Sequence, residues 1–243
     1  MMQELIRSIW TRLTRRKPHC TRGMAAITGV VLGLASLMLS GCSEGRDPQA
    51  YIKKLDAESG QVRKKAVDEL IRMRDEAVPG VKEAFLNAPR SDAGLRQVQG
   101  AVGVLKQTRT LDALQTLAKR ADDESKEVRL TVTKGAAELA QVRKKLGIQI
   151  LRDAMKDTDP RIVEAAADGL RNMNFQDATV VLEDFFERKK GIPAVYAARN
   201  LFVIDRRPSA ARFLLRRVGS DDERIRQAAR ETAVNLGSDR AVG

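Results

Sequence analysis

Two distant stretches decide the fold: VRKKAVDEL at residues 62–70 and IVEAAADGL at residues 162–170. In both, apolar residues occupy the first, fifth and ninth positions, which is the spacing of one helix face. The same frame begins again at Leu95, Val128, Pro193 and Ile225, in steps of about 32 residues. A second apolar stripe at helical spacing follows most of these segments after a turn. Units of this kind account for residues 50–243.

The composition agrees with an all-α fold. Aromatic residues make up only 4% of the chain, so its core is expected to consist of Ala, Leu, Val and Ile packed between helices. The single histidine, His19, and Cys20 lie in the first 23 residues, which leaves one cysteine, Cys42, in the rest of the chain. This inventory argues against His-based triads, Cys–His pairs and zinc sites. We therefore expect no catalysis, no metal and no cofactor.

Each unit is a helix pair of about 32 residues, with an acidic turn, then Val-Arg, then Ala and Leu at four-residue steps. This pattern resembles the HEAT-like repeat, in particular the short variety seen in phycobilin lyases. The resemblance implies a right-handed α-solenoid of about six helix-hairpin repeats, with the first helices outside and the second helices lining a concave face.

Residues 1–41 have the order of a secretory signal peptide. A basic segment covers residues 1–23, and residues 24–40, MAAITGVVLGLASLMLS, carry no charge. The apolar run would reach roughly 26 Å as a helix, slightly short of a hydrocarbon core of about 30 Å. We therefore favour a cleaved signal over a membrane-spanning anchor.

The apolar run ends in Leu39-Ser40-Gly41-Cys42, which resembles the lipobox of bacterial lipoproteins. The resemblance implies cleavage between Gly41 and Cys42 and a covalent lipid on Cys42, the only non-protein group expected. Residues 42–49 would then form a lipidated tether. The protein would be exported and lipid-anchored to the cell membrane or outer membrane, facing the periplasm or the cell exterior.

Arginines recur at one position of the repeat, each with an acid a few residues before it. Such a ladder could follow a polyanion, but we favour pairing with acids of the adjacent unit, because a guanidinium suits a bidentate carboxylate contact. We predict a structural stacking role for Arg63, Arg96, Arg129 and Arg226.

The second helices carry charges one turn apart, and their sign alternates from unit to unit. A mixed-sign face of this kind suits a folded protein partner better than a uniform polyanion. The candidate partner-binding face consists of Arg152, Lys156, Glu183, Glu187, Arg212 and Arg216.

The function expected from these features is a protein–protein interaction scaffold, or adaptor, in the cell envelope. Its partners would be envelope proteins and, through the lipid, the membrane, with no nucleic acid and no small-molecule substrate. A first alternative is a lyase or isomerase acting on a bound tetrapyrrole-like ligand, as in the phycobilin lyases. A second is a nucleic-acid-binding HEAT-like protein, which requires that the leader is not an export signal.

Overall fold

The computed structural model describes residues 47–188 and 190–241, with side chains up to residue 234. Residues from Asp47 onward form one compact unit. The predicted signal peptide, the cleavage point after Gly41 and the lipidated Cys42 lie outside the described residues, so they stay predictions.

All regular secondary structure in the described residues is helical, and the expected all-α solenoid is confirmed. A short helix, α3 (Pro48–Ile52), precedes the repeats, and a 3-10 turn, η1 (Arg74–Glu76), joins α4 to α5. The first helices of the units are α4 (Gly60–Met73), α6 (Asp92–Thr108), α8 (Lys126–Ala140), α10 (Pro160–Asn172), α12 (Gly191–Asp205) and α14 (Glu223–Ala241). The second helices are α5 (Val78–Leu86), α7 (Leu111–Ala118), α9 (Lys144–Ala154), α11 (Gln176–Glu187) and α13 (Pro208–Arg217).

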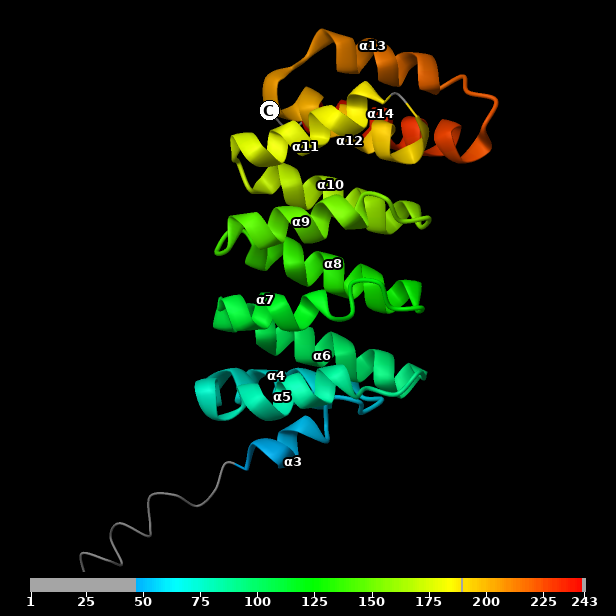
Figure 1. Cartoon of the computed structure of the whole chain (residues 1–243). Helices are drawn as coiled ribbons and strands as arrows, with labels where there is room; N and C mark the ends of the chain where they lie inside the picture. Colours follow the sequence, from blue (N-terminus) through cyan, green and yellow to red (C-terminus); the bar gives the residue numbers. More distant parts are fainter. Residues whose placement is uncertain (1–46, 189, 242–243) are drawn as a thin grey trace, which may run out of the picture. The chain divides into compact units, whose positions relative to one another are not determined.

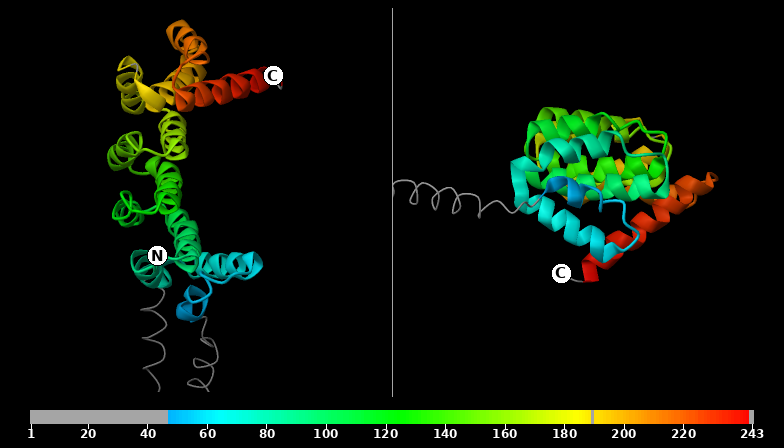
Figure 2. Two further views of the ribbon diagram at one scale, coloured as in Figure 1. Left: turned by 90° about the vertical axis from the view of Figure 1, so that its right-hand side faces the viewer. Right: turned by 90° about the horizontal axis from the view of Figure 1, so that it is seen from below.

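The helices form two layers. Each first helix packs against the first helix of the next unit, from α4 to α14, and we call this layer the first-helix column. The second helices lie beside it as a second-helix row, stacked in chain order from α5 to α13 (Figure 1). Seen from the side, α5, α7, α9 and α11 lie on one side of the stacked first helices, α13 lies at the end of the stack, and α4 and α14 extend to the other side (Figure 2). Within the described residues, α14 closes the stack without a second helix of its own.

Polar side chains fix where the first helices begin. The Ser91 hydroxyl accepts a hydrogen bond from the Gly94 amide at the start of α6. The Asp159 carboxylate accepts one from the Arg161 amide, and Pro160 occupies the first turn of α10. A side-chain cap satisfies an amide that the helix itself leaves free, and it is worth about 1 kcal/mol. The turns between units are therefore defined locally by the sequence.

The core runs the length of the stack and is built mainly from Ala, Leu and Val, as the composition predicts. It divides into two clusters of buried side chains, one from α3 to α9 and one from the end of α8 to α14. Gly100 in α6 is a point of close approach, because a Cβ there would lie 2.8 Å from the Leu55 Cδ2 atom. The glycine lets the residues before α4 pack directly on the first-helix column.

Candidate functional site

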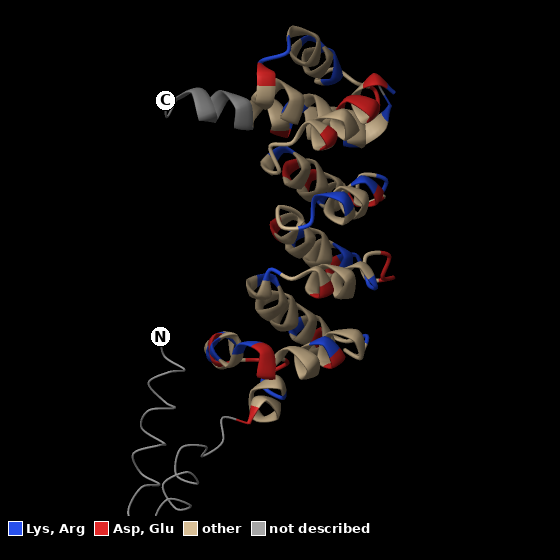
Figure 3. Ribbon diagram, turned by 60° about the vertical axis from the view of Figure 1, so that its left-hand side comes forward, with Lys and Arg blue, Asp and Glu red and all other residues tan. Residues whose placement is uncertain are grey.

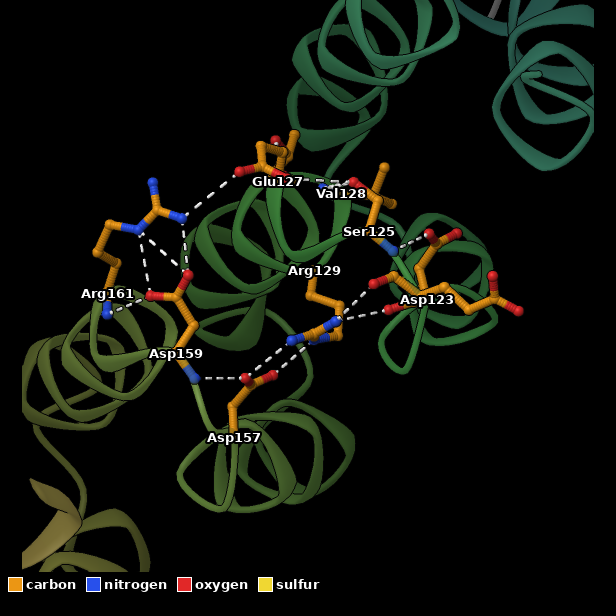
Figure 4. Close-up of polar contacts among 10 residues, drawn as sticks. Asp123, Ser125, Glu127, Val128, Arg129, Asp157, Asp159 and Arg161 are labelled. Carbon is orange, nitrogen blue, oxygen red and sulfur yellow. Dashed lines mark hydrogen bonds and ion pairs between the residues drawn. The ribbon is translucent and has the colours of Figure 1, made fainter. Parts of the chain in front are cut away.

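The most extensive polar network of the described residues lies at the turns before α8 and α10 (Figure 4). Arg129 donates from Nε and Nη2 to the two oxygens of Asp157, at 2.7 and 3.0 Å. Its Nη1 also donates to the backbone carbonyls of Asp123 and Glu124, at 2.9 and 3.1 Å. One guanidinium thus holds two successive turns together, because a planar fork can serve a carboxylate and a turn at once.

The carboxylates of this network are held in their charged form. Burial alone would raise the pKa of Asp157, but hydrogen bonds from Arg129 and from the Asp159 amide outweigh it and lower that pKa. Burial likewise opposes the shift at Asp123, where the Ser125 amide and Arg120 lower the pKa. The hydrogen bonds that Arg129 donates to Asp157 contribute most to raising the pKa of Arg129. The network is a fixed set of charges, which suits register between units.

The other three predicted stacking arginines contact backbone carbonyls. Arg63 donates to the carbonyls of Ala57 and Glu58, at 2.5 and 2.8 Å. Arg226 repeats this offset of six and five residues with Ser220 and Asp221, and it also pairs with Glu223. These arginines close the turn before their own helix.

Arg96 acts across the repeat, donating from Nε to the carbonyl of Asp56 at 2.8 Å. Of the four arginines, Arg129 is therefore the one whose guanidinium reaches a carboxylate of the adjacent unit. The stacking role stays a prediction for all four. Arg129 contacts a carboxylate of the adjacent unit and Arg96 a carbonyl across the repeat, whereas the other two contact the turn before their own helix.

Sequence reasoning missed a buried arginine in the first-helix column. Arg199 of α12 is 6% exposed and pairs with Glu164, at 2.6 Å, and with Asp168, both on α10. Burial would lower the pKa of this guanidinium, but the Asp168 and Glu164 carboxylates outweigh burial and raise it. A signal was present in the sequence: Lys134, Asp168 and Arg199 occupy one repeat position on successive first helices, with alternating sign.

The residues of the candidate partner-binding face belong to the second-helix row, and charged segments of both signs occur along the whole ribbon (Figure 3). Arg152 belongs to α9, Glu183 and Glu187 to α11, and Arg212 and Arg216 to α13, while Lys156 follows α9. Two of the six are paired within the described residues: Lys156 with Asp153 and Glu183 with Arg207, each at 2.7 Å. The remaining four are exposed and make no ion pair or hydrogen bond through their side chains with another described residue.

The architecture has a counterpart among known proteins. Residues 114–201 match the family model of HEAT repeats. This match spans the segment from α7 into α12, so that part of the solenoid is HEAT-like. No curated protein matches it at a significant level.

Solved structures share the fold of this HEAT-like solenoid. It is similar to YibA of Escherichia coli, with a TM-score of 0.53, 14% identity, and coverage of 87% of this chain and 75% of that one. It is also similar to the complex of CpcE and CpcF of phycocyanin lyase from Nostoc sp. PCC7120, with a TM-score of 0.43, 19% identity and 77% of each chain covered. An engineered protein matches with a TM-score of 0.41 and 17% identity, over 80% of this chain and 98% of that one.

One expectation from the sequence is corrected by these comparisons. We expected no catalysis, from the missing histidines and the repeat architecture. A phycocyanin lyase complex is among the structures similar to the HEAT-like solenoid, so the exclusion of enzymes was wrong. No enzymatic activity of this chain follows from that similarity.

The HEAT-like solenoid has a cleft of about 670 Å³ at the edge where its units meet, between the turn after α7 and the turn after α9. The carboxylates that line it are Asp122, Asp123, Glu124, Asp153 and Asp157. All but Asp122 form an ion pair with a lysine or arginine of the same chain. Lysines and arginines of the same chain therefore neutralise most of the carboxylates that line the cleft.

The described part of the solenoid contains neither a candidate metal site nor a candidate membrane span. Across residues 47–188 and 190–241, no group of three or more His, Cys, Asp or Glu side chains is placed to hold a metal ion. In the same part of the chain, no helix combines the length and the apolar character needed to cross a bilayer.

Proposed function

We propose that the chain is a membrane-anchored bacterial lipoprotein whose HEAT-like solenoid acts as a scaffold for another protein of the cell envelope. The observation that carries the scaffold is the set of unpaired charges on the second-helix row: Arg152, Glu187, Arg212 and Arg216. HEAT-like solenoids offer extended surfaces of this kind to protein partners. An exposed charge without an internal partner can contact another protein without breaking an ion pair of its own chain, and its sign selects the partner.

The anchor rests on the sequence Leu39-Ser40-Gly41-Cys42, which lies a few residues before the first described helix. Two or three acyl chains on Cys42 would hold the protein far more firmly than one, since each buried CH₂ contributes about 0.8 kcal/mol. The proposal places the solenoid outside the cytoplasm, on the cell membrane or the outer membrane.

The tetrapyrrole alternative fits the described cleft poorly. Bilin-type tetrapyrroles carry carboxylates, which would need basic partners in the cleft. The two basic residues that line it, Arg129 and Lys156, already pair with Asp157 and Asp153. A saturable change in bilin absorbance on mixing with the full chain would nevertheless favour the alternative.

The experiment that tests the anchor compares Cys42→Ser with a matched variant, Cys20→Ser, in cell fractionation. Cys42→Ser is expected to leave an unprocessed precursor or to release the protein from membranes. Cys20→Ser is expected to behave as wild type, because residue 20 precedes the proposed cleavage point. Wild-type processing and fractionation of Cys42→Ser would refute the anchor.

The scaffold is tested separately by crosslinking in intact cells. Arg152→Glu combined with Arg212→Glu is expected to remove the crosslinked protein that wild type gives. Lys64→Glu combined with Lys65→Glu, on α4, is the control, since both lysines are exposed and lack a described partner. Equal loss of crosslinks in both double variants would count against the second-helix row as the binding surface.

A further inference from the structure

A leucine on the second-helix row stands where the two preceding units carry a charge. Leu215 of α13 is 72% exposed. The residues at the same repeat position are Glu183 on α11 and Arg152 on α9, each following two buried residues as Leu215 does. The inward face of α13 is already occupied by its own buried side chains, Phe213 among them. Leu215 therefore adds nothing to the core and faces outward.

The charges beside Leu215 are uncompensated. Arg212 lies one turn before it, and Arg216 lies next to it and one turn from Arg212. Like charges at this spacing destabilise a helix slightly, and α13 contains no acid that could offset them. Neither arginine has a partner among the described residues. An outside group that supplies carboxylates would relieve this repulsion while it covers the leucine.

We propose that Arg212, Leu215 and Arg216 form the main contact with the partner, and that they bind a protein segment in which an apolar side chain is flanked by carboxylates. This inference rests on the proposed scaffold function and specifies its partner chemistry. Arginine is among the residues enriched in interface hot spots, and complementary charge across an interface selects the partner.

The neighbouring helix argues for a protein and against an anionic membrane as the occupant. Glu187 at the end of α11 is exposed and has no described partner, whereas Glu183 on the same helix is paired with Arg207. The Glu187 carboxylate would repel anionic headgroups, whereas a protein segment can place a basic residue opposite it. A membrane-surface helix also needs a broad apolar face, and α13 offers only Leu215 outside the core.

The first test is photo-crosslinking in intact cells, with a photoreactive residue at position 215 of the full chain. The expected product is a protein segment that carries Asp or Glu beside apolar residues. The charge reversals Arg212→Glu and Arg216→Glu together should remove it, while the double variant Lys64→Glu, Lys65→Glu should not. Position 234 is the matched control, because Val234 is 68% exposed on α14.

The outcomes separate this inference from the scaffold itself. Protein crosslinks from position 152 but not from position 215 would overturn the contact and leave the scaffold standing. Lipid crosslinks from position 215, or the same products from positions 215 and 234, would also overturn the contact. No protein crosslinks from any of these positions would overturn both proposals.

The second test measures affinity for a defined probe. A synthetic helical peptide in which leucines are flanked by glutamates is titrated against the full chain, beside the same peptide with lysines in place of glutamates. The acidic peptide is expected to bind about tenfold tighter or more, and Leu215→Gln should weaken it about tenfold. Equal binding of the two peptides, or no effect of Leu215→Gln, would overturn the proposal.

Discussion

The first-helix column and the second-helix row differ in how their neighbours meet. In the column, backbones approach closely: a Cβ on Gly169 of α10 would lie 2.7 Å from the Ala137 Cβ of α8. Charges in the column also pair between units, as Lys106 does with Glu138 at 2.9 Å. The row also has pairs between units, Lys82 with Asp112 at 2.8 Å and Arg207 with Glu183 at 2.7 Å. Several of its charges, such as Arg152, nevertheless have no partner among the described residues. The column fixes the geometry of the stack, and this leaves the row free to carry recognition.

The largest expected effect comes from adding volume to the column. Gly169→Val would force the new side chain against Ala137 and Leu151, with a clash that α8 and α10 can relieve only by moving apart. We expect a loss of about 3 kcal/mol in the free energy of unfolding, measured with urea. Gly103→Ala is the control, because its Cβ would make ordinary contact with Val67 at 3.6 Å. If both variants are equally stable, close packing does not hold the column together.

Removal of the buried arginine should have the next largest effect. Arg199→Met leaves Glu164 and Asp168 without their partner at the contact between α10 and α12. Both acids remain about a third exposed, so water can solvate them in part, and we expect a loss of about 2 kcal/mol. Arg152→Met in the row should change stability by less than about 0.5 kcal/mol. Similar losses in the two variants would erase the distinction between the layers.

Acid should weaken the contacts between turns. The pKa of Asp157 is lower in the folded chain than in the unfolded chain, where the pKa of an aspartate is about 3.9. Its contribution is therefore complete above this pH and is lost as the pH falls through the lower folded value. Asp157→Asn should flatten the decline of unfolding free energy below about pH 4. Asp177→Asn, at an exposed residue of α11, should leave the slope unchanged.

The smallest expected effect is that of truncating Leu215, for which the adjacent Leu214 of α13 serves as the control. Leu214 is 4% exposed and Leu215 is 72% exposed. Leu214→Ala should cost about 2 to 4 kcal/mol, because it empties a core position. Leu215→Ala should change the free energy of unfolding by less than about 0.5 kcal/mol. A large loss from Leu215→Ala would show that this leucine is structural.

The fold could be predicted from the sequence because its cause is local. The spacing of Val62, Ala66 and Leu70 sets a helix face, and Asp159 with Pro160 sets a helix start, whatever the neighbouring units do. These signals recur at about 32 residues, and repetition turns a helix pattern into a solenoid. The expected all-α solenoid agrees with the structure, although within the described residues the sixth unit has only its first helix, α14.

The contacts between units could be predicted only in part, because they depend on how one helix pair is rotated against the next. Arg129 and Arg63 share a repeat position, yet only Arg129 finds a carboxylate in the next turn, at Asp157. Gly100 could have marked either a close contact or a soft joint, and the approach of Leu55 decides for the contact. Helical spacing alone could not show which of the adjacent leucines, Leu214 or Leu215, lies in the core.

A lipid tether on Cys42 is proposed to hold this solenoid at a membrane surface, and intact mass spectrometry of the chain extracted from cell membranes is the decisive experiment. We expect a polypeptide that begins at Cys42 and carries the mass of a diacylglycerol group, with or without a further acyl chain. A chain that still contains residues 1–41, with an unmodified thiol at Cys42, would contradict it.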